Sequence, residues 1–373
     1  MKRMCITSTA LVVFLLMAGC WDQDLLRNAR LIYGAGFDLA PNGKLLTTIV
    51  IRDLPQSEQQ SPANDIIYAV GNTPRDTRDK ADNQVSRLLR SYRNRVILIG
   101  EELAKQDIYP ILDVFYRDPK SALNAKIAVT QGKATDILSL KKVGNVLIAE
   151  EIDELIKSKE KTTSIPKVTL ETIYPAIIDP GEDFVLPYLV RKGKRVDISR
   201  IAMFHDQRFT GVLSPDESTM CLLLQARMGK ITSFTQKLSA QKDHKGSHDY
   251  ITFQINKSKR KMEVLVQPDD QISVTLDLKW TVGVEEYPKD QLNDKKMIAQ
   301  LNQHLSKAMT DLAKKTLQKM QEARCDGLGI ARQLMAFHPE IWKRQKENWG
   351  SNYQKVHFAP QIHVDITKKG IIN

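Results

Sequence analysis

The stretch QLNDKKMIAQLNQHLSKAMTDLAKKTLQKMQEA, residues 291–323, does most to decide the fold of this 373-residue chain. Its apolar and small residues return every three or four positions, which is the spacing of one helical face. The inward face is predicted to hold Ile298, Leu301, Leu305, Ala308, Leu312, Thr316 and Met320. Such a helix would be roughly 50 Å long, and the glycine-containing run Asp326-Gly327-Leu328-Gly329 would end it. We therefore expect one long amphipathic helix in the C-terminal part of the chain.

Strand patterns lie on both sides of this helix. Three strands are predicted before it, at Tyr250–Ile255, Met262–Val266 and Ile272–Val284, and the basic run 256–261 is predicted to be a turn between the first two. After it we expect a second helical stretch that reaches about Trp349, and then a last strand over residues 355–366. The C-terminal half is therefore predicted to combine a sheet with helices.

The first half mixes strands and helices without a regular crossover. Strands are predicted at 30–39, 45–51, 66–70, 95–99, 125–130 and 184–190. Helices are predicted at 73–89, from residue 101 onward, and at 109–115, 134–140, 147–159 and 167–174. A hairpin at 196–204 and 208–212 is expected next, followed by a helix at 215–224. Because strand–helix–strand units do not repeat regularly, the expected class is α+β, with mixed β-sheets and packed helices in two to three domains. The charged turn Arg191–Arg195 is the predicted boundary between an N-terminal domain, 30–195, and a C-terminal domain, 196–373, with a further subdivision of the second left open.

The N-terminus has the layout of a lipoprotein export signal. Lys2 and Arg3 precede an apolar stretch, and Met17-Ala18-Gly19-Cys20 places small residues just before a cysteine. The stretch is too short for a membrane-spanning helix, which needs about 20 residues. We predict a signal peptide over 1–19, S-diacylglycerol and N-acyl (palmitate-like) modification of Cys20, and a lipid-anchored leader over 20–29. An uncleaved anchor and an ordinary secretory signal are the alternatives, and both also place the chain outside the cytoplasm.

The net charge of the chain indicates which kinds of binding partner to expect. Loss of Lys2 and Arg3 with the signal lowers the formal net charge from +11 to +9, which favours attraction to anionic lipid headgroups. Nucleic acid is not expected, because the basic residues are spread out and few aromatic residues interleave with them.

After Cys5 leaves with the signal and Cys20 is acylated, only Cys221 and Cys325 remain; two buried thiols are expected, with a disulfide as the alternative.

Four other motifs each have a structural and a functional interpretation. Gly34-Ala35-Gly36 fits a turn or close backbone packing better than a nucleotide site, because no glycine follows at the required spacing. The run 243–249 holds Ser, His and Asp, but neighbours in one polar loop do not form a catalytic triad. Trp342 and Trp349 would share a helical face, either in the core or toward a partner, and the basic runs Arg191–Arg195 and Lys257–Lys261 would be solvated or would touch anionic lipid. No catalytic, metal-binding or cofactor-binding residues are predicted.

Five stretches, taken in order along the chain, carry a resemblance to a known family. They are Gly19-Cys20-Trp21-Asp22 with Leu25; Tyr33-Gly34-Ala35-Gly36-Phe37-Asp38; Val96 to Ala104 with Asp113 and Arg117-Asp118; Ile201-Ala202-Met203-Phe204 with Phe209-Thr210-Gly211; and Cys325-Asp326-Gly327-Leu328-Gly329 with Pro339, Trp342 and Trp349. On these the chain resembles the Ger(x)C family, the C subunits of spore germinant receptors. It departs from the family pattern at Met17 and at Cys325.

The resemblance implies a function that composition does not show. Such proteins are lipid-anchored on the outer face of the inner spore membrane, and they act with A and B membrane subunits in nutrient-triggered germination. No catalytic residues carry over, and Cys20, the lipidation site, is the one functional position that does. The alternative hypothesis is an extracytoplasmic solute-binding lipoprotein of a transporter, which would have two similar lobes around a ligand cleft.

Overall fold

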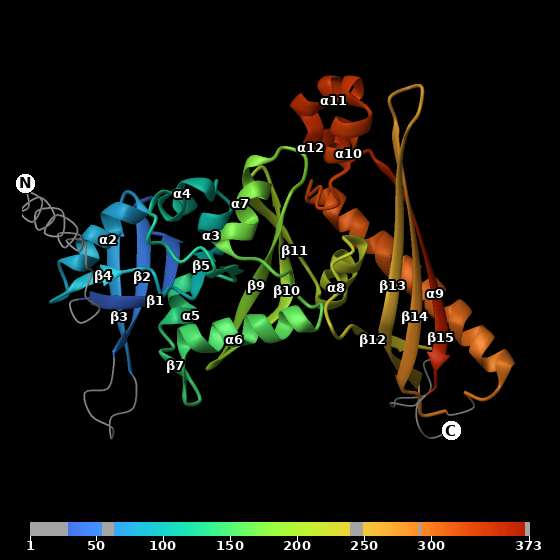
Figure 1. Ribbon diagram of the computed structural model, residues 1–373, viewed down its shortest axis with the longest axis horizontal. Coiled ribbons are helices and arrows are strands. Elements are labelled where there is room, and N and C mark those ends of the chain that lie inside the picture. Colours follow the sequence, from blue (N-terminus) through green and yellow to red (C-terminus); the bar gives the residue numbers. More distant parts are fainter. Residues whose placement is uncertain (1–28, 54–62, 239–248, 290–291, 370–373) are drawn as a thin grey trace, which may run out of the picture.

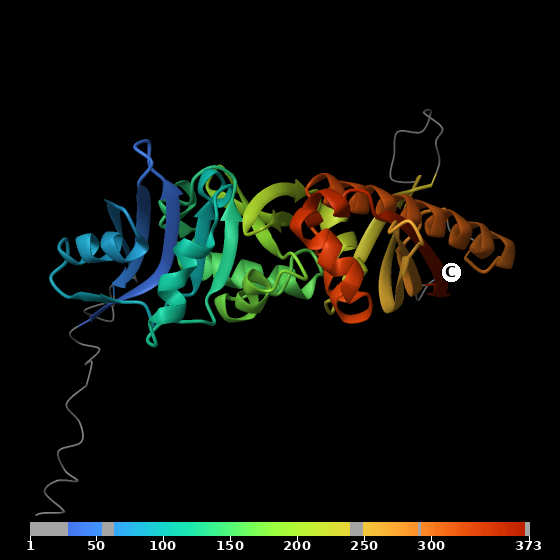
Figure 2. The same cartoon turned by 90° about the horizontal axis from the view of Figure 1, so that it is seen from above.

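The computed structural model describes residues 29–53, 63–238, 249–289 and 292–369. Within them the chain forms an elongated molecule with one sheet toward each end (Figures 1 and 2). The first sheet has nine strands and the second has four, and helices pack on both. The predicted α+β class with mixed sheets and packed helices is confirmed.

The nine-stranded sheet is mixed, with the order β11-β10-β9-β6-β5-β1-β2-β3 and with β4 paired to β1. Its strands are β1 (Ala29–Leu39), β2 (Leu45–Asp53), β3 (Ala63–Gly71), β4 (Leu88–Arg90), β5 (Val96–Gly100), β6 (Lys126–Thr130), β9 (Val185–Lys192), β10 (Arg195–His205) and β11 (Arg208–Leu213). The central contacts of β5 with β1 and β6, and of β6 with β9, are parallel, whereas the outer hairpins are antiparallel. The central strand β5 is buried along its whole length, as expected for a strand with helices on both faces.

Helices cover the two faces of this sheet. They are α2 (Pro74–Asp82), α3 (Glu101–Ala104), α4 (Tyr109–Arg117), α5 (Ala134–Leu138), α6 (Ile148–Lys161) and α7 (Leu170–Ile178), and a small hairpin of β7 (Lys142–Val143) and β8 (Val146–Leu147) precedes α6. Ile97 and Ile99 of β5 point into the core shared with α3, α4 and α7. Val96 and Leu98 point into the opposite core, with α5 and α6. The alternation follows from the two-residue period of a strand.

The second sheet packs against the long helix. It has the order β12-β13-β14-β15, and its strands are β12 (Ser233–Lys237), β13 (Tyr250–Val266), β14 (Ile272–Glu286) and β15 (His357–Lys368). Helix α9 (Lys295–Glu322) runs along it, and α10 (Ile330–Phe337), α11 (Pro339–Gln345), a 3₁₀ turn at Lys346–Asn348 and α12 (Trp349–Tyr353) follow. The predicted long helix is thus confirmed at 28 residues.

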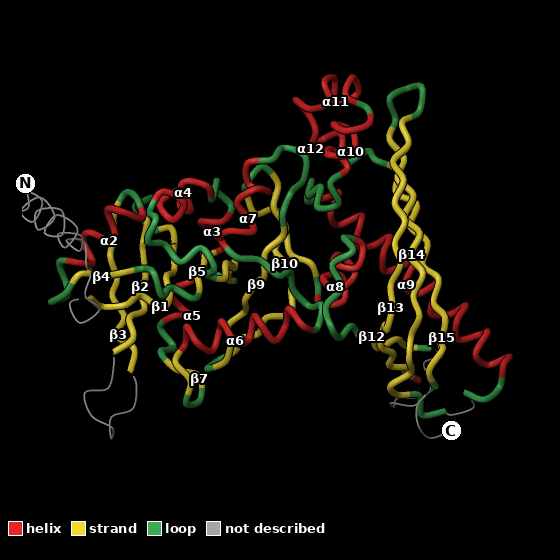
Figure 3. The backbone as a smooth tube through the Cα atoms, in the orientation of Figure 1, coloured by secondary structure: helices red, strands yellow, loops and turns green. Residues whose placement is uncertain are grey.

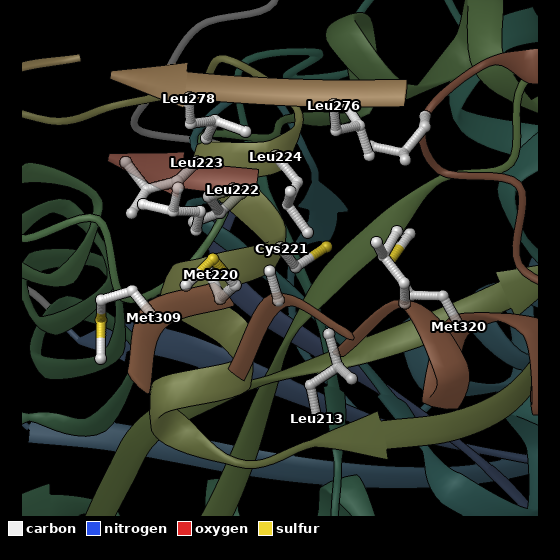
Figure 4. Packing of buried hydrophobic residues seen from close by; sticks show 14 of the residues in the cluster. Leu213, Met220, Cys221, Leu222, Leu223, Leu224, Leu276, Leu278, Met309 and Met320 are labelled. Atoms are coloured by element: carbon white, nitrogen blue, oxygen red, sulfur yellow. The ribbon is translucent and has the colours of Figure 1, made fainter. Parts of the chain in front are cut away.

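Helix α8 (Pro215–Leu224) joins the two sheets through one hydrophobic core. Nearly all of its side chains are buried, including Met220, Cys221 and the run Leu222–Leu224. Figure 4 shows them between Leu213 of β11, Met309 and Met320 of α9, and Leu276 and Leu278 of β14. A helix that is apolar on most sides needs such an enclosed position.

The buried face of α9 is rotated from the predicted one. Leu301, Leu305, Thr316 and Met320 are buried as predicted, but Ile298, Ala308 and Leu312 are only partly buried, while Met309, Ala313 and Leu317 are buried instead. The reason is a polar row on α9: Asn302, Ser306 and Thr310 accept hydrogen bonds from the backbone N–H groups of Ile366, Val364 and Ile362 in β15. These side chains satisfy the free edge of β15, which sequence periodicity of apolar residues does not reveal.

Three predicted elements were wrong in detail. Residues 256–261 are no turn, because β13 runs unbroken from Tyr250 to Val266 (Figure 3). Helix α2 ends at Asp82, earlier than predicted, and residues 88–90 form the strand β4 where the end of the helix was expected. The second C-terminal helical stretch is broken at His338, which lies between α10 and α11 with non-helical dihedral angles.

The predicted domain boundary falls within a hairpin. β9 and β10 pair from Lys192 and Arg195 inward, around a turn in which Gly193 has a φ of 62°. The hydrogen-bonded sheet therefore continues through the predicted division at residues 195 and 196. The division of the chain into domains at that point stays a prediction.

Candidate functional site

A hollow of about 760 Å³ lies where the two halves of the chain meet. Its walls are the α7–β9 connection (176–184), the β10–β11 turn (205–207), the segment after α9, and residues 342–351 of α11 and α12. These segments are far apart in sequence, and they meet because β9, β10 and α10 converge there. Because it brings together segments of both sheets, this hollow is the candidate site.

His205 lies between two carboxylates at the edge of this hollow. Its Nδ1 is 3.0 Å from Asp183 Oδ2, and its Nε2 is 3.5 Å from Asp206 Oδ2. Burial disfavours the charged ring, but the hydrogen bond and charge of Asp183, helped by the charge of Asp206, raise the pKa of His205 above its usual value. The pair therefore favours an imidazolium held in place. No Ser, Thr or Cys among the described residues hydrogen-bonds to this ring, so the arrangement provides no activated nucleophile.

Asp326 is a buried acidic side chain at the junction. It is 1% exposed, and its carboxylate accepts hydrogen bonds from the backbone N–H groups of Ile330 and Ala331 at 2.9 and 2.8 Å and from Trp349 Nε1 at 3.1 Å. Burial raises the pKa of Asp326 to about 8, although these three donors oppose the shift. Its main work is structural: it binds the first turn of α10 and fixes the indole of α12.

Ion pairs tie α10 to the α7–β9 connection. Arg332 contacts Asp179 and Glu182, the second at 2.8 Å, and its backbone N–H donates to the carbonyl of Gly181 at 2.9 Å. Glu182 also pairs with Arg227, which follows α8. The site is therefore a polar joint that holds the two sheets together through ion pairs and hydrogen bonds.

The two predicted tryptophans lie at this joint. Trp349 is 7% exposed and packs edge-on against Trp342, with 5.7 Å between the ring centroids, but the two belong to α12 and α11 and not to one helical face. The core interpretation of Trp349 is confirmed. The apolar side chain that is most exposed nearby is Phe337, at 71%.

The glycine motif in β1 is a packing motif, as predicted. A Cβ at Gly36 would lie 2.8 Å from Leu138 and 3.0 Å from Ala134, so α5 can approach the strand only at glycine. Asp38, at the end of the motif, caps α5 by accepting hydrogen bonds from the N–H groups of Ala134 and Thr135 and from the Thr135 hydroxyl. The motif positions a helix and shows no helix N-terminus open to a phosphate.

The remaining predicted positions are not brought into the joint. Cys221 and Cys325 are free, buried thiols, as expected, and burial raises the pKa of both. Arg191–Arg195 spans the β9–β10 turn, and Lys257, Lys259 and Lys261 line one exposed side of β13. Cys20 and residues 243–248 lie outside the described residues, and Asp249 is buried beside Lys289 at 3.3 Å.

Metal clusters and membrane-spanning helices are both absent from the described residues. No group of three or more His, Cys, Asp or Glu side chains in them is placed to hold a metal ion. None of their helices is both long enough and apolar enough to cross a membrane.

Sequence reasoning missed Asp183, His205 and Arg332, and it assigned Asp326 only to a helix stop. Each is a single residue in a turn or near an element end, and the contacts that join Asp183 to His205 and to Asp326 link positions distant in the sequence. The one available signal was that Asp326 precedes two glycines at the start of a helix. Their convergence became visible only with the tertiary structure.

Comparison with known proteins covers almost the whole chain. Residues 22–191 match the family described as "Spore germination protein N-terminal domain", and residues 199–370 match "Spore germination B3/ GerAC like, C-terminal". Spore germination protein GerQC of Bacillus cereus is 22% identical over 97% of this chain and 98% of its own length. Spore germination protein KC of Bacillus subtilis (strain 168) is 21% identical over 98% and 94%. The crystal structure of the GerBC protein superposes with a TM-score of 0.54 at 18% identity, over 89% of this chain and 96% of that one, which shows the shared fold.

Proposed function

The chain belongs to the Ger(x)C family of spore germination proteins, and from this membership we propose that it is the lipid-anchored, non-enzymatic C subunit of a spore germinant receptor. In this role it acts with the A and B membrane subunits in nutrient-triggered germination. The match of both halves of the chain to the two family descriptions is the observation that carries the proposal. The relatives named for spore germination align with nearly their full lengths.

The N-terminal sequence supports the lipid anchor. Met17-Ala18-Gly19-Cys20 offers a lipidation site, and the first described strand begins at Ala29, nine residues after Cys20. Two or three acyl chains at one cysteine hold a protein stably at a membrane, whereas a single chain does not. The anchor would keep the folded body on the outer face of the inner spore membrane.

The joint between the sheets supports a role in assembly and not in catalysis. His205 is flanked by Asp183 and Asp206. The carboxyl group of Asp326 accepts hydrogen bonds from the N-terminus of α10 and from Trp349. These groups are used to hold segments of this chain together. Confinement at the membrane would raise the effective concentration of the body toward the A and B subunits, so even weak contacts would form a complex.

The test is a Cys20→Ala substitution in spores, with Cys5→Ala as a matched control. Cys5 is also a cysteine of the N-terminal segment, but no small residues precede it in the required pattern. We expect Cys20→Ala to release the protein from the membrane fraction and to abolish the nutrient response, and Cys5→Ala to change neither. Normal membrane retention and normal germination of Cys20→Ala spores would refute the anchor.

A rescue separates anchoring from receptor membership. A Cys20→Ala chain fused to an unrelated transmembrane segment should recover nutrient-triggered germination, because only membrane attachment is missing. A spore that lacks the whole chain should fail to respond to its nutrient. A full nutrient response in that deletion strain would overturn the receptor role itself.

The solute-binding alternative receives less support from the fold. Two similar lobes were expected for it, but the two sheets differ in strand number, order and direction. The hollow at the joint is the one feature that favours it. Calorimetry with amino acids and sugars distinguishes the two functions, since a C subunit acting as a scaffold releases no heat with them.

A further inference from the structure

The end of the molecule where the chain enters the first sheet carries a second, basic hollow. This hollow has a volume of about 220 Å³, and it is lined by Arg75, Arg78, Arg90, Ser91, Tyr92, Asp118 and Lys120. We propose that this basic hollow binds the phosphate of an anionic phospholipid headgroup, so that the protein touches the membrane at a second point beside its acyl anchor. The proposal rests on the membrane attachment at Cys20 proposed above.

The position of the hollow is set by the pairing of β4 with the first strand. Ala29, Arg30 and Leu31 pair in parallel with Leu88, Leu89 and Arg90. The hollow therefore adjoins the first described residues of the chain, nine residues after Cys20. Because a residue spans at most about 3.6 Å, Ala29 lies within about 32 Å of Cys20, and the hollow adjoins the strand that Ala29 begins. Figure 1 shows α2 and β4 at the end of the molecule that is remote from the second sheet.

The charges in and around the hollow favour an anion. Four basic side chains line it and one carboxylate does, Asp118, which lies 3.6 Å from Arg78. Arg75 pairs with Asp79 at 3.2 Å on the exposed surface of α2, where such pairs are weak and screened by salt. Arg87 and Arg93 extend the basic surface on either side of β4, and both are exposed.

Apolar side chains at the same end fit the interfacial region of a bilayer. Leu88 is 54% exposed at the start of β4, although a leucine in a short strand is usually covered. Tyr92 lines the hollow itself, and tyrosine is enriched at the headgroup level of membranes. The stretch Arg87-Leu88-Leu89-Arg90-Ser91-Tyr92-Arg93 therefore offers guanidinium groups for phosphates together with a leucine and a tyrosine for the interface.

The experiment uses residues 20–373 with Cys20→Ser, so that no acyl chain contributes. Sedimentation with vesicles of phosphatidylcholine containing phosphatidylglycerol is compared with pure phosphatidylcholine. The variant Arg75→Glu with Lys120→Glu changes two exposed residues that line the hollow. The matched control is Lys295→Glu with Lys296→Glu, which makes the same charge change on exposed positions at the start of α9.

We expect binding to the anionic vesicles only, and a loss of more than about 25-fold in the Arg75→Glu and Lys120→Glu variant, since each basic residue near an anionic surface is worth roughly fivefold and the variant also reverses both charges. The control should lose less than threefold. Inorganic phosphate at millimolar concentration should not release the protein from the vesicles, because a free phosphate cannot replace the contacts of Leu88 and Tyr92 with the bilayer. Equal losses in both variants, or binding to pure phosphatidylcholine that matches the anionic vesicles, would overturn the proposal.

Two further measurements distinguish headgroup binding from misfolding and from binding of free phosphate. Thermal unfolding of both variants checks that they are folded, and Arg75→Gln with Lys120→Gln gives a milder change with an expected loss of about 25-fold, since two basic charges of roughly fivefold each are removed. Full displacement of the chain by inorganic phosphate would identify a free-phosphate site and refute the headgroup. Failure here leaves the Cys20→Ala result in spores unaffected, so the two proposals can fail separately.

Discussion

The backbone N–H of Asp326 donates a 2.8 Å hydrogen bond to the carboxylate of Asp183, and the backbone N–H of Asp183 donates to the carbonyl of Asp326 at 3.1 Å. This reciprocal pair joins two residues that are 143 positions apart. The same carboxylate oxygen of Asp183 also forms a 3.0 Å hydrogen bond with Nδ1 of His205. One side chain thus links the first sheet, the end of α9 and the β10–β11 turn.

Substitution of Asp183 should loosen this joint. Asp183→Ala leaves the buried N–H of Asp326 without an acceptor, which costs about 1–3 kcal/mol in free energy of unfolding. Asp183→Asn keeps one carbonyl oxygen, so we expect a smaller loss. Urea unfolding followed by tryptophan fluorescence measures both, since Trp349 reports on the joint. Equal stability of the Ala variant and the parent would show that the reciprocal pair does not hold the halves together.

Gly350 and His205 should show strong energetic coupling. A Cβ at Gly350 would lie 2.3 Å from His205 Nε2, and the ring cannot move away freely because Asp183 holds it. Gly350→Ala should therefore destabilise the parent by about 1–3 kcal/mol. In a His205→Ala background the same change should be neutral or slightly stabilising, because alanine favours the helix α12. A double-mutant cycle gives the coupling, and additivity within about 0.5 kcal/mol would contradict the predicted clash.

Stability should fall as the pH rises toward 8. The folded-state pKa of Asp326, about 8, lies above its ordinary value of 3.8, so the folded chain keeps a proton that the unfolded chain has lost. Its contribution is therefore lost across pH 4 to 8, by up to about 1.4 kcal/mol per pH unit. His205 adds to the same trend, because its raised pKa stabilises the folded state below about 6.5 and this contribution is lost as the pH rises through the folded-state value.

Denaturation at pH 5.5, 6.5, 7.5 and 8.5 measures this trend. Asp326→Asn and His205→Gln should each be less stable than the parent at pH 5.5 and should show a flatter pH dependence. The charged groups that face His205 are Asp183, Asp206 and Arg324, and none of them changes in these variants. Parallel curves for the parent and Asp326→Asn would show that Asp326 does not titrate in this range.

The sequence predicted the elements of this fold better than their junctions. The strands β1, β2, β5 and β6 and the helix α9 follow local apolar periods, and a local period can be read in a single chain. The sequence predicts two strands in place of β13 because residues 256–261 are polar at every position and therefore resemble a turn. In the structure a register shift between Ile255 and Lys257 changes the outward face, and lysines then protect an edge of the sheet.

The candidate site could not be predicted, for a different reason. Asp183, His205 and Asp326 meet only because β9, β10 and α10 are brought together by the whole topology. The polar row Asn302, Ser306 and Thr310 on α9 has a helical spacing of four, but apolar periodicity gives no weight to it. Residue patterns reveal which face is buried, whereas long-range hydrogen bonds depend on where the neighbouring element lies.

The end of β5 should tolerate no side chain at Gly100. A Cβ there would lie 2.0 Å from Asp38 Oδ1, and three hydrogen bonds to Ala134 and Thr135 fix that carboxylate. Gly100→Ala should lower the free energy of unfolding by about 2–4 kcal/mol, because either the cap of α5 or the strand must shift. Gly211→Ala is the control, since its nearest contact is the flexible tip of Met203 at 3.1 Å. Similar losses at both positions would mean that Asp38 relaxes easily.

Glu217 should stabilise the contact between α8 and α9 in a pH-dependent way. It is 1% exposed and contacts Lys315 at 3.2 Å and Lys319 at 2.7 Å. Burial disfavours its charge, but the hydrogen bonds from Lys319, Ser214 and Lys315 prevail and lower the pKa of Glu217 from 4.5 to about 2. A lowered pKa contributes stability that is present above pH 4.5 and is lost as the pH falls toward 2. The shift corresponds to about 3 kcal/mol.

Glu217→Gln should therefore lose about 2–3 kcal/mol at pH 7 and almost nothing relative to the parent near pH 2. The glutamine retains an oxygen for the N–H of Ser214, so the cap of α8 is preserved while the ion pair is lost. Lys319→Gln should cost more than Lys315→Gln, because Lys319 is 36% exposed and Lys315 is 65% exposed. Urea titrations from pH 2.5 to 7 measure all three variants. If the Glu217→Gln difference is the same at every pH, the ion pair contributes no free energy and the buried glutamate acts only as a cap.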